Sequence, residues 1–345
     1  AMGSRGFCVF IVSTWAVSAL AWNHVGNNLI IGLNQAKLQS RAHLSTRSRG
    51  VLFAQMKDSA TVQKNRVLVT GVGPVSSIGV GVKGFLDNLY AGKCGISELP
   101  EWARELPTSI AGQVKDLKVE DWYSEKKDAK RQSRYMHLGI VASKLAMKDA
   151  QLESTCIQDR NRFGVLIGTA IGGSEYYEGA SEKWAKHSSY SNVPQGGGAS
   201  WGDSSFAGRN SVFKGPSWMD GSQFTYEGFK KISPFIVPAF IMNSGSGVAA
   251  VELDARGPNY AIGGYGGEGT AAALSIGQAH RFLSTGEADV FVAGGSESCL
   301  SPCAVAGLNH LGKCVTGRND HPEAACRPFD AEHAGFAVGE GSAVL

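Results

Sequence analysis

The side chains of this sequence best suited to covalent chemistry are its seven cysteines, because a thiolate can act as a nucleophile, a redox partner or a soft metal ligand. The sequence has no CxxC pair, and the short Cys299 to Cys303 spacing lacks the second His or Cys pair that a zinc site requires. The pattern therefore predicts reduced, buried or half-buried thiols in a reducing compartment. The seven are Cys8, Cys94, Cys156, Cys299, Cys303, Cys314 and Cys326.

A glycine-rich turn at 263–269 is the most distinctive local motif. Gly264, Gly266 and Gly269 follow the GxGxxG spacing between an expected strand and an expected helix, and Asp289 follows further along the chain. A turn of this kind can bind the phosphates of a dinucleotide at the helix N-terminus. In a Rossmann unit, however, the acid that binds the ribose ends its strand, whereas Asp289 stands near the start of one. Dinucleotide binding is therefore an open but weaker alternative.

The same turn has a geometry that suits a catalytic nucleophile. A side chain at the N-terminus of a helix lies in the positive field of the helix dipole, which stabilises an anion and lowers a thiol pKa. No Cys, Ser or Thr occurs in the turn before Thr270. The turn thus offers the position for covalent catalysis without the side chain.

Apolar runs and helical spacing predict the elements that hold this turn. Strands are expected at 66–71, 163–168, 259–262 and 288–293, and helices at 82–91, 134–151, 235–255 and 270–283. Strands alternating with helices indicate an α/β fold with a mainly parallel sheet, whose sites lie in loops at the carboxyl ends of the strands. Gly and Ser dominate 174–230, which predicts a long inserted loop.

The basic charge of the chain is concentrated at its N-terminus. The formal net charge is +3, from 33 Lys and Arg against 30 Asp and Glu, yet residues 1–64 contain seven basic side chains and only one acid, Asp58. The remainder, 65–345, is mildly acidic, which argues against a nucleic-acid-binding protein.

Residues 1–64 have the composition of a targeting leader. The apolar run at 7–22 follows Arg5 and ends in small residues like a secretory signal, and 23–64 is rich in Arg and Ser like a transit peptide. We therefore expect a two-step leader that directs the protein to a plastid. We expect no stable membrane span, because a transmembrane helix needs about 20 apolar residues. A membrane anchor or an untidy N-terminal extension are the alternatives.

Blocks in the body of the chain resemble the elongating β-ketoacyl-acyl-carrier-protein synthases of the thiolase superfamily. They occur in the family's order across nearly all of 65–345. The blocks are RVLVTGVGPVSSIG from 66, GVLIGTAIGG from 164, GPNY from 257, GEAD from 286, AGGSE from 293, RPFD from 327 and GEG from 339. The resemblance implies a thiolase-like, layered αβαβα fold made of two similar halves. Residues 65–345 would form the N-terminal domain and the start of the second half.

The resemblance also implies a reaction. An acyl chain moves from acyl carrier protein to an active-site Cys, malonyl-carrier protein loses CO₂, and the resulting carbanion attacks the acyl group. Backbone N–H groups would form an oxyanion hole, and two His residues of the second half would assist decarboxylation. Both substrates are carried on the phosphopantetheine of the carrier protein, so no separate cofactor is expected.

This sequence departs from the family at its catalytic positions. Gly266, within Ala261–Glu268, occupies the position of Cys in the family's Ser-Ile-Ser-Thr-Ala-Cys-Ala-Thr turn. The chain ends at Leu345, where the family's second half begins, so both catalytic His positions fall beyond it. We therefore predict that this sequence does not catalyse condensation. The histidines near the C-terminus are expected in loops or on the surface; they are His310, His321 and His333.

The expected partners follow from the same resemblance. Acyl carrier protein is acidic, so a synthase needs a local basic patch, and Lys130, Arg131 and Arg134 are the candidates by position. The family implies a homodimer or a heterodimer with another synthase. The main interpretation is a component of plastid fatty-acid synthesis. The alternatives are a non-catalytic partner or scaffold subunit and, further away, a dinucleotide-binding protein.

Overall fold

The computed structural model describes residues 65–187, 232–263 and 270–345. The expected leader at 1–64, most of the glycine-rich insertion and the critical Gly266 lie outside these ranges. The strands are β1 Gly73–Ser76, β2 Gly79–Val80, β3 Ile96–Glu98, β4 Ile110–Gly112, β5 Phe163–Gly168, β6 Asn259–Tyr260, β7 Val290–Ser298 and β8 Val338–Val344. The helices are α4 Gly81–Tyr90, α5 Lys126–Ala129, α6 Arg134–Asp149, α7 Ser174–His187, α9 Ile236–Phe240, α10 Ser244–Leu253, α11 Thr270–Ser284 and α12 Pro302–His310. Short 3₁₀ turns include η2 Val119–Trp122 and η7 Pro322–Ala324.

The main sheet has the strand order β2-β1-β8-β7-β5-β6. β5 pairs in parallel with both β6 and β7, whereas β8 runs antiparallel to β7 and to β1. The sheet is therefore mixed, and the expectation of a mainly parallel sheet holds only for its β7-β5-β6 part. The carboxyl ends of β5, β6 and β7 and the amino end of β8 meet at one edge, which brings four chain segments together.

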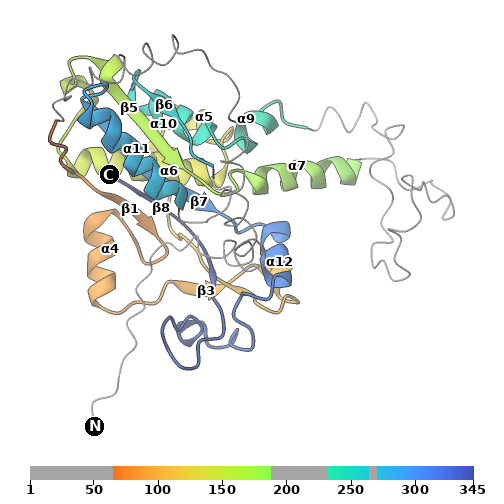
Figure 1. Ribbon diagram of the computed structural model, residues 1–345. Coiled ribbons are helices and arrows are strands. Elements are labelled where there is room, and N and C mark those ends of the chain that lie inside the picture. The colour runs from red at the N-terminus through yellow and green to blue at the C-terminus, as the bar shows by residue number, and fades with distance from the viewer. Residues whose placement is uncertain (1–64, 188–231, 264–269) are drawn as a thin grey trace, which may run out of the picture.

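Helices cover both faces of the sheet (Figure 1). Val165 and Ile167 of β5 pack into the core cluster with residues of α6 and α10, while Gly168 lies against α11 on the other face. A Cβ at Gly168 would stand 2.5 Å from the Ala271 carbonyl oxygen, so only glycine lets α11 approach this closely. This helix–sheet–helix sandwich matches half of the expected layered fold.

A second, smaller sheet lies beside the main one. β3 pairs antiparallel with β4, and β4 pairs in parallel with the start of β8. The segment between α12 and β8, which we call the 311–337 connection, packs onto these strands. It is fixed by a hydrogen bond from Thr108 Oγ1 to the Val315 carbonyl and by one from Ser109 N–H to Asn319 Oδ1 of 3.0 Å.

Several sequence predictions are confirmed within two residues. The helices expected at 82–91, 134–151 and 270–283 are α4, α6 and α11, and the strand at 163–168 is β5. All six residues of β5 are buried, as its uninterrupted apolar pattern indicated. These elements are long or strongly apolar, so their local pattern is sufficient to define them.

The buried strand expected at 66–71 is wrong. These residues form no strand, and Leu68 and Val69 are 63% and 65% exposed. The segment runs past the C-terminal end of α6, where Gly71 packs against α6 and Val72 N–H donates to Asp149 at 2.9 Å. An apolar run becomes a strand only beside a neighbour with open hydrogen-bonding groups, and no described strand pairs with it.

The single helix expected at 235–255 is also wrong, because the chain forms α9 and α10 with a break at 241–243. At the break, the hydroxyl of Tyr135 donates to the Ile241 carbonyl at 2.8 Å and lies 3.4 Å from the Met242 carbonyl oxygen.

In the expected loop at 174–230, the first residues form α7, whose Glu178 carboxylate accepts from Ser301 Oγ and Cys303 N–H at the start of α12. Tertiary contacts decide both differences. Within the described ranges, no helix has the length and apolar character needed to cross a membrane.

Candidate functional site at the carboxyl edge of the sheet

An apolar pocket of about 350 Å³ lies where the segments after β5 and β6 approach each other. Its lining combines the loop after β5, the break between α9 and α10, and the chain leading into the glycine-rich turn. The lining residues are Ile171, Phe240, Ile241, Met242, Asn243, Ala261 and Gly263. Pockets of this size with mostly apolar walls suit small organic ligands and acyl chains.

The loop that forms one wall of this pocket is held by a buried carboxylate. Glu297, near the end of β7, is 6% exposed. Its Oε2 accepts hydrogen bonds from Thr169 Oγ1 at 3.0 Å, Ala170 N–H at 2.6 Å and Ile171 N–H at 2.9 Å. Because this one carboxylate accepts hydrogen bonds from three successive residues of the loop after β5, it fixes the turn that carries Ile171.

A second buried carboxylate, Glu340, stands opposite Ser298 on the neighbouring strand β8 and is paired with Arg134 of α6. Arg134 donates from Nε to Oε2 at 3.0 Å and from Nη2 to Oε1 at 2.8 Å. Glu340 also accepts from Val114 N–H and from Ser298 Oγ, both at 2.9 Å. This bidentate pair ties α6, the segment after β4, β7 and β8 together at one point.

The N-terminus of α6 is held at the same edge by two further contacts. Glu175, in the first turn of α7, accepts the Arg134 backbone N–H at 2.6 Å, and burial raises the pKa of this carboxyl. Ser296 Oγ of β7 donates to the Tyr135 carbonyl at 2.6 Å. Because the Tyr135 hydroxyl in turn holds the α9–α10 break, α6 connects the buried carboxylates to the far wall of the pocket.

The three basic residues expected to dock a carrier protein have different surroundings. Lys130 is exposed at the end of α5. Arg131 is exposed as well, and its guanidinium lies 3.0 Å from Asp128 and 4.8 Å above the centre of the Phe235 ring. Arg134, by contrast, is directed inward onto Glu340. Carrier docking stays a prediction for all three, but only the first two present their charge at the surface.

The described lining of the pocket carries no thiol and no imidazole. Gly266 lies within 264–269, outside the described residues, three positions beyond the pocket-lining Gly263. Cys299, which directly follows β7, is buried in a separate apolar cluster with Leu308 and Val338. The prediction for the three C-terminal histidines is confirmed, because each is exposed; they are His310, His321 and His333.

The structure argues against a dinucleotide site, because Asp289 does not lie where the ribose of such a ligand would bind. Asp289 lies just before β7, whereas Gly263, the last described residue before the glycine-rich turn, bridges to Thr169 beyond the other end of the β5–β7 pair, about 20 Å along the strands. Its carboxylate binds Arg162 through two hydrogen bonds of 2.7 Å. Asp289 therefore cannot bind a ribose at that turn.

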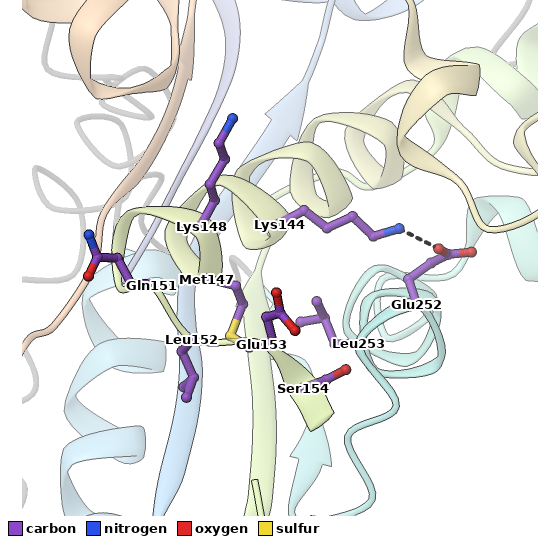
Figure 2. Close-up of a pocket in the computed structure, with 9 residues that line it drawn as sticks. All are labelled: Lys144, Met147, Lys148, Gln151, Leu152, Glu153, Ser154, Glu252 and Leu253. Carbon is purple, nitrogen blue, oxygen red and sulfur yellow. Dashed lines mark hydrogen bonds and ion pairs between the residues drawn. The ribbon is translucent and has the colours of Figure 1, made fainter. Parts of the chain in front are cut away.

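A second cavity, of about 430 Å³, lies at the other end of α6. Figure 2 shows Lys144 of α6 reaching Glu252 of α10 across its rim, with Nζ 2.6 Å from Oε2. Glu252 also accepts from the N–H and the hydroxyl of Ser124. This ion pair fixes the segment after η2 onto α10 and is remote from the glycine-rich turn. In the part of the chain that the structure describes, no three His, Cys, Asp or Glu side chains gather to hold a metal ion.

Comparison with known proteins identifies the family. Residues 64–345 match the family described as "Beta-ketoacyl synthase, N-terminal domain". This chain belongs to the β-ketoacyl synthase family. It is 33% identical over 290 residues to 3-oxoacyl-[acyl-carrier-protein] synthase 2 of Staphylococcus aureus (strain N315), covering 82% of this chain and 57% of the relative. It is 31% identical over 287 residues to the Synechocystis protein of the same name, covering 83% and 58%. The chain thus spans less than two thirds of these curated relatives.

Solved structures agree with the fold. A ketosynthase of a type II polyketide synthase, in complex with its acyl-carrier protein, shares 26% identity and a TM-score of 0.58 over 82% of this chain and 58% of its own. A ketosynthase from Xenorhabdus doucetiae, in complex with its chain length factor, shows the fold again at 19% identity and a TM-score of 0.55, over 80% and 56%. The described sandwich is therefore part of a β-ketoacyl synthase fold of the thiolase superfamily.

Glu297 and Glu340 are the residues of this edge to which sequence reasoning gave no role, although both lie in the quoted blocks AGGSE and GEG. The available signal was a charged residue within a run of small residues at the end or start of a buried strand. Such a carboxylate must be paired or hydrogen-bonded when the strand is buried. The sequence does not show which donors it meets, because these come from the segment after β4, the loop after β5, and α6.

Replacing Arg134 should test the buried pair. Arg134→Met leaves the Glu340 carboxylate buried without its counter-charge, so we expect the free energy of unfolding to fall by roughly 3–5 kcal/mol. Arg131→Met removes an exposed guanidinium and should cost about 1 kcal/mol or less. Urea denaturation at neutral pH measures both. Equal losses in the two variants would contradict a special role for the buried pair.

The half-buried His137 of α6 should make stability depend on pH. Its Nδ1 lies 2.8 Å from the Tyr123 hydroxyl, and burial, together with the nearby charge of Arg134, lowers its pKa from 6.5 to about 4. Between these values the unfolded chain binds a proton that the folded chain does not. Stability is therefore fully present above pH 6.5 and should fall by up to about 3 kcal/mol as the pH decreases to 4.

The control for this pH effect is His137→Gln, which does not titrate. Urea midpoints measured between pH 4 and pH 7 should change less in the variant than in the unchanged protein. Parallel pH profiles for the two proteins would show that another group causes the loss.

Proposed function

We propose that this chain is the acyl-binding part of a 3-oxoacyl-[acyl-carrier-protein] synthase that acts in fatty-acid elongation. The observation that carries this proposal is the apolar pocket beside the glycine-rich turn at the carboxyl edge of the sheet. Position 266 lies three residues beyond the pocket-lining Gly263, which is about 10 Å of chain at most. The names of the relatives from Staphylococcus aureus and Synechocystis support the same substrate class.

The arrangement suits an acyl thioester. The apolar walls would accept the hydrocarbon chain, and the thioester carbonyl would then lie at the mouth of the pocket, next to the N-terminus of α11. That helix end favours negative charge, both on a thiolate nucleophile and on the oxyanion that forms when it attacks. The substrates would arrive on the phosphopantetheine arm of the carrier protein, which requires no cofactor resident in this chain.

With glycine at 266, this sequence has no thiol at the nucleophile position. Loss of a covalent nucleophile removes on the order of six decades of rate in a well-studied serine hydrolase. We therefore propose that the chain folds and binds acyl groups as a synthase does but does not form the acyl-enzyme or condense it with malonyl-carrier protein.

A second candidate function is that of a non-catalytic partner of an active synthase. Besides Gly266, the observation that favours it is the edge of the main sheet. β6 has β5 on one side, and its Asn259 and Tyr260 are exposed, with no described strand on the other side. An open edge strand can pair with a strand of a second subunit. We propose a dimer through this edge, with either a second copy or an active synthase.

The location of the protein is proposed from its leader. The acid-poor composition of 1–64 supports delivery to a plastid, where the carrier protein of fatty-acid synthesis would be its partner. A fluorescent protein fused behind residues 1–64 should accumulate in plastids.

A thiol at position 266 should restore acyl loading. We expect the full 345-residue chain incubated with radiolabelled acyl-carrier protein to retain only background label, and Gly266→Cys to retain close to one acyl group per chain. The gain has a physical reason, since only that variant places a thiolate at the pocket and the N-terminus of α11. Denaturing gels run without reductant measure the thioester, and hydroxylamine should release it.

The matched control is Gly277→Cys, which adds a thiol on α11 where a Cβ meets no other atom. Loading of Gly266→Cys at the level of this control would contradict the proposed nucleophile position. Release of 3-oxoacyl-carrier protein by the unchanged chain above the blank rate would contradict its inactivity. If Gly266→Cys stays unloaded while the unchanged chain forms a stable mixed dimer with an active synthase, the partner function is correct instead.

Charge reversal at the exposed basic pair should weaken carrier binding. We expect Lys130→Glu combined with Arg131→Glu to raise the dissociation constant for acyl carrier protein about tenfold at low salt, and less at 0.5 M salt where charges are screened. Lys93→Glu with Arg104→Glu changes the net charge equally at other exposed positions and should have little effect. Calorimetric titration measures both, and equal affinities would reject this docking site.

A further inference from the structure

Two cysteines from distant parts of the chain meet on one small apolar core beneath the 311–337 connection. Cys94 lies just before β3, and Cys326 lies just after η7. Both half-buried side chains pack against the same cluster, which consists of Ile96, Ile110, Val315 and Ala325. No described cysteine other than these two belongs to this cluster.

Local contacts place the two thiols near each other. Cys94 Sγ accepts the Ile96 N–H at 3.5 Å, which directs it along the start of β3. β3 and η7 are in direct contact. The pKa of Cys94 is raised chiefly by burial and also by the charges of Glu323, which belongs to η7, and of Cys326. The Cys94 thiol therefore faces η7 and the residue that follows it.

We propose that Cys94 and Cys326 form a reversible disulfide that fastens the 311–337 connection to β3. Both side chains are partly exposed, so a small oxidant can reach them. With glutathione disulfide as oxidant, one cysteine thiolate attacks and releases one glutathione thiol, leaving a mixed disulfide. The second cysteine then displaces the other glutathione. Two protein thiols thus become one disulfide, two electrons pass to the oxidant, and two glutathione thiols leave.

The bond would act on the segment that leads into β8. In the described structure the 311–337 connection is held by Thr108 and Asn319 and by a single bridge between Cys314 and Phe336. β8 follows directly and carries Glu340, the carboxylate that pairs with Arg134. A covalent link between segments so far apart in sequence restricts the unfolded chain strongly. The oxidised protein should therefore unfold at a higher temperature.

Peptide mapping tests the bond directly, on the full chain equilibrated with glutathione disulfide and digested with trypsin without reduction. Cys94 and Cys326 are then the single cysteines of peptides 94–104 and 319–345. We expect these two peptides joined, with a mass two hydrogens below their sum, and separated again by dithiothreitol. Formation should be faster at pH 9 than at pH 7, because the raised pKa of Cys94 keeps it protonated at neutral pH.

Three variants make the test specific. The joined peptides should persist in Cys156→Ser, whose exposed cysteine lies elsewhere, and should be absent from Cys94→Ser and Cys326→Ser. The oxidised unchanged protein and Cys156→Ser should both gain several degrees in melting temperature, and the other two should not. The proposal is overturned if peptides 94–104 and 319–345 occur only as separate glutathione adducts, as unmodified thiols or joined to other cysteines. Because this readout involves no acyl substrate, it is independent of the proposed synthase function.

Discussion

The structure depends on the burial of two carboxylates where strands β5, β7 and β8 meet. Glu297 and Glu340 are both nearly inaccessible to solvent, and a buried charge is stable only when hydrogen bonds and an opposite charge replace water. Glu297 therefore accepts hydrogen bonds from backbone N–H groups of the loop after β5, and Glu340 pairs with Arg134 at the start of α6. These hydrogen bonds fix the start of α6 and the loop that forms one wall of the pocket.

The hydrogen bonds of Glu297 and Glu340 are made by residues that support the fold, and none of these residues has a proposed chemical role. The described contacts of the two carboxylates involve backbone N–H groups, Arg134 and the hydroxyls of Thr169 and Ser298. The described sheet edge and the wall of the apolar pocket are thus held by residues outside 264–269.

The elements that were predicted correctly are determined by their local residue pattern, whereas those predicted wrongly depend on partners elsewhere in the chain. β5 and α6 were predictable because an uninterrupted apolar run and a long helical repeat are decisive by themselves. The run at 66–71 has an equally good strand pattern, but hydrogen-bonding partners for its backbone are absent from the described sheet. The expected 235–255 helix is interrupted at 241–243, where the hydroxyl of Tyr135, a residue distant in sequence, donates to the carbonyl of Ile241. The three residues predicted to dock a carrier protein share one basic stretch, yet only the fold shows that Arg134 points inward to Glu340.

The sequence by itself determined the family, the α/β class, the position of the glycine-rich turn and the absence of a thiol from it, because these depend only on residue order and type. Tertiary structure alone decided which distant segments of the chain come together. The pocket wall at Ile171, the pairing of Arg134 with Glu340 and the packing of Cys94 and Cys326 against one apolar cluster each join segments far apart along the chain. Such contacts arise from burial and hydrogen-bond satisfaction across the whole sheet, and no local pattern of residues records them.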